Sequence, residues 1–336
     1  MNEEAVVTNP TTEAEPLSAF DIDLDGLDLA LDPARLQPVL DEALGGESPV
    51  RILGIHLLKH RPRRRCSLAV DVEANGRRRR LFVKVFRHAR AGRVERAMRH
   101  LRRALSRTET TRVPRPLHAK RSPNILITEF VEGAAVAPYL YSMRPAETAG
   151  KVARSLADLH ASGVELPRVW RVEDELANTR RWVAQVPDDL RDSARRLLSE
   201  LQTLAPPDVR PMPIHRDFYP EQLLTSGRHC YLLDLDDARM GDGAVDAGNF
   251  LAHLRLRSFE DRGRRGACVR AANAFRRMYL EARSRDMDLS RRVDFYEVAT
   301  LLRLAGFYSS RGEQNPQLPM VLLNVARARL DRLSRR

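Results

Sequence analysis

The stretch HRDFYPEQ at residues 215–222, followed by LLDLDD at residues 232–237, is the most informative part of this chain. It places an aspartate at Asp217, an amide five residues later at Gln222, and another aspartate twelve residues further on at Asp234. Phosphoryl transfer from a nucleotide needs one carboxylate to orient the attacking hydroxyl, and a side-chain oxygen with a second carboxylate to hold Mg²⁺ against the phosphates. The spacing therefore predicts phosphoryl-transfer chemistry.

The part of the chain before this stretch is rich in predicted strands. Asn75 and Gly76 form the strongest short signal for a hairpin turn. Apolar residues at helical spacing predict a helix over 92–105, and Asp32 followed by proline predicts the start of a helix over 33–44. The pattern indicates a small antiparallel sheet with one inserted helix. The predicted strands cover residues 50–58, 67–73, 79–86 and 125–133.

After about residue 140 the pattern is mainly helical. The catalytic stretch interrupts the helices as loop and short strand. The sequence thus predicts an α+β protein with two lobes: residues 31–133 form the nucleotide-binding lobe and residues 134–336 form a helical lobe. Residues 1–30, which are acidic and low in aromatics, are predicted to be a disordered or loosely attached arm. The predicted helices of the second lobe include 190–204, 267–283, 291–306 and 318–333.

The charge of the chain is strongly basic, with a formal net charge of +12 and a pI of about 10.3 over 336 residues. Such a balance raises the possibility of a nucleic-acid or anionic-membrane partner. Arginines are spread through every segment after residue 50, and no aromatic residue interleaves the runs at 61–65 and 77–80. An arginine bias on solvated faces is therefore favoured, which makes nucleic acid an unlikely partner, and a basic nucleic-acid-binding module remains the alternative.

Features that would direct the chain to a membrane or out of the cell are missing from the sequence. No apolar run approaches the roughly 18 residues needed to span a bilayer. The first sixteen residues have neither the basic nor the apolar region of a secretory signal. Cys66, Cys230 and Cys268 are too widely spaced for a disulfide framework or a zinc pattern. We therefore expect a cytoplasmic protein.

Four motifs together resemble the aminoglycoside phosphotransferase and choline kinase-like family, which shares the protein-kinase fold. The resemblance covers residues 50–310 and implies a two-lobed fold that transfers the γ-phosphate of ATP or GTP to a hydroxyl of a small molecule, with Mg²⁺. The motifs are LADLH at 156–160, IHRD at 214–217 with Gln222, LDLDDA at 233–238, and Gly241–Asp242 with Asp246.

The resemblance assigns roles to the residues of the catalytic stretch. Asp217 would be the catalytic base or the group that aligns the acceptor hydroxyl, and an Asx-turn is the alternative. Gln222 stands where the family has the metal-binding Asn, although a structural role is open. Asp234 matches the metal-chelating aspartate, and Asp236 would add a metal contact if the strand continues, while either could cap the following turn.

Other residues are matched to nucleotide binding. Lys84, in an apolar strand, is the candidate phosphate-clamping lysine, with a charged residue on an edge strand as the alternative. Glu95 is the candidate partner of this lysine, and a surface ion pair with Arg99 competes with that role. Backbone groups of Glu129 and Val131 would contact the base. No glycine-rich phosphate loop is present.

Supporting residues also match the family. Asp246 would buttress the catalytic loop or cap the next helix. His160 and His215 are interpreted as structural, and Arg216 stands where the family usually has Gly. Because of Gln222 and the missing glycine loop, a kinase-like protein with impaired catalysis remains a second alternative.

The acceptor is the least defined part. Residues 251–336 contain nineteen arginines and nine acidic residues. A polycationic aminoglycoside would be repelled by such a field, so a neutral or anionic hydroxylated small molecule is expected. Asp261, Asp294 and Glu297 are the acids that could reverse this balance locally.

Overall fold

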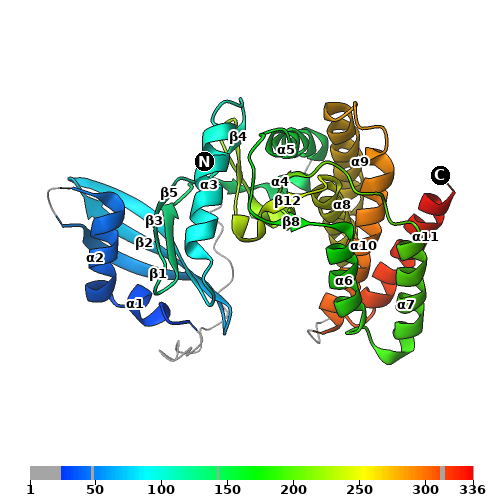
Figure 1. Ribbon diagram of the computed structural model, residues 1–336, viewed down its shortest axis with the longest axis horizontal. Coiled ribbons are helices and arrows are strands. Elements are labelled where there is room, and N and C mark those ends of the chain that lie inside the picture. Colours follow the sequence, from blue (N-terminus) through cyan, green and yellow to red (C-terminus); the bar gives the residue numbers. More distant parts are fainter. Residues whose placement is uncertain (1–23, 47–48, 142–143, 311–314, 336) are drawn as a thin grey trace. The chain divides into compact units, whose positions relative to one another are not determined.

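The computed structural model describes residues 24–46, 49–141, 144–310 and 315–335. The chain divides into two compact units, whose elements are labelled in Figure 1. Unit 1 holds an antiparallel sheet and unit 2 is mainly helical, which confirms the predicted α+β class. Unit 1 consists of Met1–Arg102 and Val113–Ala134, and unit 2 consists of Arg103–Arg112 and Ala135–Arg336.

The sheet of unit 1 has five strands in the order β1-β2-β3-β6-β5, with all neighbours antiparallel. The predicted hairpin is confirmed, since Ala74 pairs with Arg77 across the turn. Both turn residues have positive φ, 50° at Asn75 and 69° at Gly76, as a two-residue turn of this hand requires. The strands are β1 (Arg51–Arg61), β2 (Arg65–Ala74), β3 (Arg77–Phe86), β5 (Pro116–Lys120) and β6 (Ile125–Glu129).

Two helices, α1 (Leu27–Leu31) and α2 (Pro33–Leu44), cover one face of this sheet. The Asp32 carboxylate accepts a hydrogen bond from the backbone N of Ala34 at 2.8 Å, which explains the start of α2. Leu24 and Leu27 are buried in the core of unit 1, so the loosely attached arm does not reach residue 30 as predicted. Residues 1–23 lie outside the described residues. Helix α3 (Ala91–Leu105) lies on the other side of the sheet from α2 (Figure 1).

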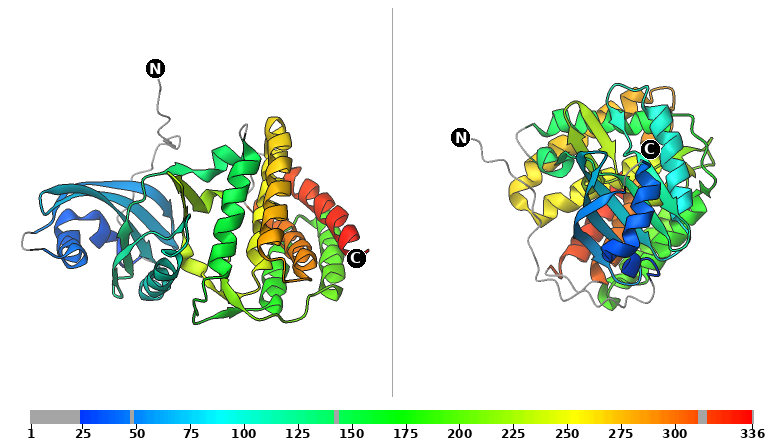
Figure 2. Two further views of the ribbon diagram at one scale, coloured as in Figure 1. Left: turned by 90° about the horizontal axis from the view of Figure 1, so that it is seen from above. Right: turned by 90° about the vertical axis from the view of Figure 1, so that its left-hand side faces the viewer.

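Unit 2 is a helical bundle in which α8 packs against both α9 and α10. The first half of α8 is buried on all sides, and a Cβ at Gly248 would lie 2.6 Å from the backbone N of Glu297, so α8 and α10 cross in close contact. Helix α11 lies beside α7 and α10 (Figures 1 and 2). The helices are α4 (Val136–Leu140), α5 (Pro145–His160), α6 (Val172–Val183), α7 (Asp188–Thr203), α8 (Ala244–Glu260), α9 (Arg265–Ala282), α10 (Leu289–Ser309) and α11 (Leu318–Ser334).

Short strands and 3₁₀ turns carry the stretch that the sequence singled out. Strand β9 pairs with β12, and β12 pairs with β8, while β11 pairs with β10 and with β4. Among the described residues, no helix is long and apolar enough to cross a membrane. These elements are β4 (Thr111–Arg112), β7 (Ala134–Ala135), β8 (Val169–Trp170), β9 (Met212–Ile214), η1 (Pro220–Gln222), β10 (Leu223–Ser226), β11 (His229–Leu232), η2 (Leu235–Asp237), β12 (Arg239–Gly241) and η3 (Arg262–Arg264).

Candidate active site

Asp217 lies in the loop that joins β9 to η1, and a buried carboxylate from α8 holds this loop. Asp246 is fully buried and accepts hydrogen bonds from the backbone N of His215 and of Arg216, both at 2.7 Å. Gly243 is the N-cap of α8, so Asp246 does not cap the helix and instead buttresses the loop. These two hydrogen bonds fix the backbone immediately before Asp217.

Two histidines connect the loop to its surroundings. His160 Nε2 lies 3.0 Å from Asp246 Oδ2, and His160 Nδ1 lies 2.9 Å from the hydroxyl of Tyr279, with all three groups buried. His215 Nε2 donates to the carbonyl of Leu233 at 2.7 Å, because a carbonyl can only accept. The loop of Asp217 is therefore bonded to the residue that precedes Asp234.

The hairpin of β10 and β11 explains why Gln222 and Asp234 are twelve residues apart. Leu223 pairs with Leu232, and the carbonyl of Gln222 accepts from the backbone N of Leu233 at 2.9 Å. The chain therefore returns to Gln222 just before Asp234. Gln222 Nε2 lies 3.4 Å from Asp234 Oδ2 and 2.9 Å from the Tyr219 hydroxyl.

The amide of Gln222 and the carboxylate of Asp234 supply the kind of oxygen ligands that Mg²⁺ takes. Mg²⁺ is usually held by one or two carboxylates together with substrate phosphates and water. Among the described residues, no group of three or more His, Cys, Asp or Glu side chains could hold a metal on its own. A half-turn of the Gln222 amide would direct its oxygen, instead of its nitrogen, toward the ion.

Asp236 is placed differently from the strand-based expectation. Strand β11 ends at Leu232, Asp234 has a left-handed backbone with φ 54°, and a 3₁₀ turn starts at Leu235. The strand does not continue, so alternation along a strand gives no reason for Asp236 to face the same way as Asp234. Asp236 is buried, and its role as a metal ligand stays a prediction.

Arg216 is anchored by an aromatic ring, that of Trp170, which no sequence motif connects to the site. Its guanidinium carbon lies 3.9 Å from the ring centroid of Trp170, and that of Arg239 lies 5.0 Å from it. Arg216 Nη1 is 3.5 Å from Asp237 Oδ2, and Arg239 Nη2 is 3.1 Å from Asp237 Oδ1. Arg216 has φ 67°, the left-handed conformation that favours Gly, and these contacts hold a larger side chain there.

The environment of Asp217 shifts its proton affinity. Burial raises the pKa of the Asp217 carboxyl above its ordinary value, and the neighbouring Asp234 carboxylate adds to this, while the Arg303 guanidinium opposes it. A carboxylate with a raised pKa is better suited to accept a proton than an exposed one. Asp217 also lines a small cavity of unit 2, together with Glu175, Asn178, Arg216, Val245, Asn249, Thr300 and Arg303.

Lys84 lies in the middle of the sheet of unit 1. Strand β3 is flanked by β2 and β6, so the edge-strand interpretation of Lys84 is wrong. Val83 and Val85 join the core under α1 and α2, and alternation places Lys84 on the opposite face. Its side chain is 5% exposed, and its Nζ lies 5.2 Å from the ring centroid of Phe86.

The other predicted nucleotide-binding residues also lie in unit 1. The Glu95 carboxylate pairs with Arg99 Nε at 2.7 Å, which is the competing surface pair. The backbone N of Glu129 donates to the Arg115 carbonyl at 2.9 Å, so only its carbonyl could contact a base. Val131 follows β6, and within the described residues its backbone makes no hydrogen bond. The roles of Glu95, Glu129 and Val131 in nucleotide binding stay predictions.

The resemblance to kinase-like phosphotransferases implied an antiparallel-sheet lobe and a helical lobe, and both are present, with Gln222 and Asp234 side by side in the helical unit. The sequence model of the phosphotransferase enzyme family, APH, matches residues 67–292. The chain therefore belongs to this family, and it is a kinase with a hydroxyl acceptor. No curated protein sequence matches the chain significantly.

Solved structures share the fold at low sequence identity. A choline kinase from Cryptosporidium parvum matches with a TM-score of 0.58 and 11% identity, covering 90% of this chain and 96% of that chain. A putative fructosamine-3-kinase from Thermobifida fusca matches with a TM-score of 0.56 and 19% identity, covering 88% and 98%. A spectinomycin phosphotransferase, in complex with ADP and spectinomycin, matches with a TM-score of 0.52 and 11% identity, covering 88% and 98%.

Proposed function

We propose that this protein transfers the γ-phosphate of ATP to a hydroxyl group of a small metabolite in a Mg²⁺-dependent reaction. The observation that carries the proposal is the loop geometry: Asp246 of α8 holds the backbone of His215 and Arg216, and the His215 side chain bonds to the carbonyl of Leu233, the residue before Asp234. The base and one metal ligand therefore belong to one connected element.

In the proposed reaction Asp217 aligns the acceptor hydroxyl and accepts its proton at a carboxylate oxygen. Gln222 and Asp234 would hold Mg²⁺, which when bound neutralises charge on the phosphates. In the nucleotide-binding lobe, Lys84 would contact the phosphates with Glu95 orienting it, and the backbones of Glu129 and Val131 would contact the base.

Removal of the Asp234 carboxylate tests the metal site directly. We expect Asp234→Ala to lose Mg²⁺-dependent ATP binding, because the Gln222 amide that remains is a weak neutral ligand. Calorimetry with and without Mg²⁺ measures this binding. Asp208→Ala is the matched control, since Asp208 is a surface carboxylate paired with Arg171. Equal Mg²⁺-dependent binding by wild type and Asp234→Ala would remove Asp234 from the metal site. GTP in place of ATP, tested in parallel, identifies the nucleotide.

A neutral or anionic acceptor fits the basic balance of residues 251–336, with nineteen arginines and nine acidic residues, and the position of Arg303 beside Asp217. Three acids could have attracted a polycation, but each is bound to arginine: Asp294 to Arg276 and Arg329, Glu297 to Arg255 and Arg329, and Asp261 to Arg264. None of the three lines the small cavity, whose own acids are Asp217 and Glu175, the latter bonded to Trp170 Nε1. Arg303 does line it, and its side chain bonds to the neutral amide of Asn249.

Arg303 should therefore select against cationic acceptors. We expect a panel of neutral sugars, sugar acids, choline and aminoglycosides to yield its best acceptor among the first two classes. Arg303→Gln should raise KM for a sugar acid about tenfold or more, because a charge-assisted hydrogen bond contributes roughly 1.5–3 kcal/mol. Arg327→Gln, which alters a surface pair with Glu200, is the control. A panel in which only aminoglycosides are phosphorylated would contradict this proposal.

We also propose a cytoplasmic location. The three cysteines, Cys66, Cys230 and Cys268, are all buried and form no disulfide with one another, which is typical of proteins in a reducing compartment. Burial raises the pKa of the Cys230 thiol to about 11, which keeps it in the less reactive protonated form.

A further inference from the structure

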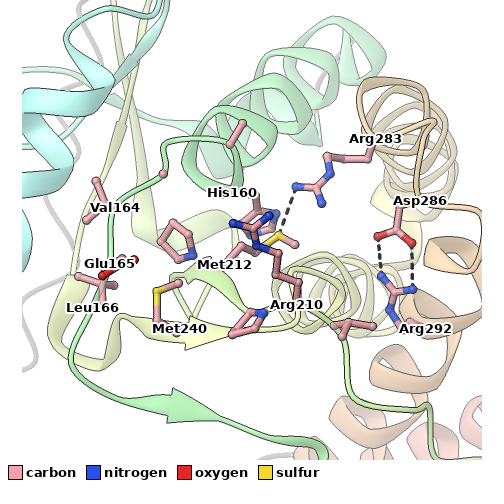
Figure 3. Close-up of a pocket in the computed structure, with 15 residues that line it drawn as sticks. His160, Val164, Glu165, Leu166, Arg210, Met212, Met240, Arg283, Asp286 and Arg292 are labelled. Carbon is pink, nitrogen blue, oxygen red and sulfur yellow. Dashed lines mark hydrogen bonds and ion pairs between the residues drawn. The ribbon is translucent and has the colours of Figure 1, made fainter.

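A second and larger cavity of unit 2 lies against β9, the strand that precedes the loop of Asp217. Its volume is ≈ 700 Å³, which is within the range of small-molecule sites. Met212 and Pro213 of β9 and His160 at the end of α5 form part of its wall, as Figure 3 shows for Met212 and His160. Asp217 does not line it, so this cavity is separate from the one described above.

Two arginines from different elements point into this cavity. Arg210 comes from the segment before β9 and Arg283 from the C-terminal end of α9 (Figure 3). Arg283 Nη1 donates to the thioether sulfur of Met212 at 3.2 Å, and sulfur is a weak acceptor. Within the described ranges, no carboxylate forms an ion pair with Arg210 or Arg283. Both guanidinium groups therefore keep most of their hydrogen-bonding capacity.

The acidic residues that line this cavity do not neutralise Arg210 and Arg283. Asp286 is held by Arg292, whose Nη1 and Nη2 donate to it at 2.9 and 2.6 Å, and Arg292 Nε also donates to Asp242 at 2.9 Å. Glu165, the other acid of the lining, is exposed, as is Arg210. The lining as a whole, with three arginines against the acids Glu165 and Asp286, carries one excess positive charge, and Arg210 and Arg283 are its arginines without a carboxylate partner among the described residues, which favours a ligand with several anionic oxygens.

The cavity wall is connected to the catalytic loop through short contacts. Met212 and Pro213 are followed at once by Ile214 and the loop that starts at His215. His160 holds Asp246, which in turn accepts the backbone N–H groups of His215 and Arg216. A ligand packed on His160 and β9 would therefore stiffen the two residues that precede Asp217.

We propose that this cavity is a regulatory site for a small polyanionic metabolite held by Arg210 and Arg283. The binding part of the proposal is independent of the proposed kinase activity, and the regulatory part rests on it. Polyphosphate and polycarboxylate ligands share the required chemistry, so pyrophosphate and citrate are the two probes.

Calorimetric titration of each probe into the full chain tests the binding. We expect binding of at least one probe, weakened about tenfold or more in Arg210→Gln with Arg283→Gln, because two charge-assisted contacts are lost. Arg285→Gln, an exposed neighbour that does not line the cavity, should bind like wild type. The single variant Arg210→Gln guards against misfolding, since Arg210 is exposed and should still lose part of the affinity.

Two results would overturn the binding proposal. One is no binding of either probe at millimolar concentration, and the other is equal affinity in wild type and the double variant, which would place pyrophosphate at another site such as the nucleotide site.

Hydrogen exchange tests the link to the loop without requiring activity. The bound probe should slow exchange of the backbone amides of His215 and Arg216 in wild type, and have no effect in the double variant. Exchange that the bound probe leaves unchanged would disprove the regulatory part. A protein with no kinase activity would remove the proposed function but leave both readouts interpretable.

Discussion

The Asp217→Asn variant should lose kcat by roughly 10²–10⁴-fold on the best acceptor of the panel, the range that a general base contributes. Asn keeps the size of the side chain but cannot accept the proton of the hydroxyl. Nucleotide binding should persist, because Gln222 and Asp234 are unchanged. Steady-state kinetics and calorimetry on the same preparation measure both quantities. A variant with wild-type kcat would exclude Asp217 as the base.

The same variant should be at least as stable as wild type at neutral pH. Burial raises the pKa of Asp217 in the folded state, so the ionised form is less favourable there than in the unfolded chain. The contribution of Asp217 to stability is therefore fully present below the unfolded pKa of about 3.9 and is lost as pH rises through the folded pKa. Asparagine does not ionise, so the Asp217→Asn variant does not lose this stability as pH rises.

Denaturant unfolding at a series of pH values measures the free energy of unfolding of both proteins and shows whether the pKa of Asp217 is raised in the folded state. The stability advantage of Asp217→Asn should be present at pH 7 and vanish at acid pH, while Asp208→Asn at an exposed site should show no such trend. An advantage that grows as pH falls would contradict the raised pKa. The pH–rate profile of the wild type should likewise show, on its acid side, an apparent pKa above that of an ordinary aspartate.

Local signals predicted much of the fold. Asp32 and Pro33 predicted the first residues of α2, and Asn75 with Gly76 predicted the β2–β3 hairpin, because cap and turn geometry depend on adjacent residues. The β10–β11 hairpin was missed as a hairpin. Its strands have four residues each, and the only local signal was Gly227, whose φ is 58°. Such short strands are set by their tertiary neighbours.

The sequence predicted that Gln222 and Asp234 come together, but not which other residues hold them in place. Spacing alone indicated Asp217, Gln222 and Asp234 as a set. The contact of Arg216 with Trp170 joins residues 46 positions apart, and no local pattern marks it. The position of Asp236 depended on whether β11 continues, and β11 ends at Leu232, before the left-handed backbone at Asp234 and the 3₁₀ turn that follows. Contacts across such separations depend on packing that periodicity does not encode.

Asp246→Ala should have the largest effect on folding of the changes considered. Asp246 is fully buried and receives the backbone N–H groups of His215 and Arg216 as well as His160 Nε2. Alanine leaves all three groups without their acceptor. Breaking a buried pair of this kind costs on the order of 3–5 kcal/mol, a large part of the roughly 5–15 kcal/mol of a typical domain. Denaturant unfolding measures the loss.

Graded variants separate the loop contacts from the histidine contact. Asp246→Asn keeps one acceptor oxygen for one of the two backbone groups, so it should fold better than Asp246→Ala yet still lose kcat by about 100-fold, the expected cost of a misplacement near 1 Å. His160→Gln leaves the backbone contacts of Asp246 intact and should retain more activity. Asp261→Ala, at the far end of α8 and partly exposed, should change stability by only about 0.5 kcal/mol. If Asp246→Asn kept wild-type kcat, the position of the loop would not depend on Asp246. The contact of His215 with Leu233 would then have to hold Asp217 near Asp234 by itself.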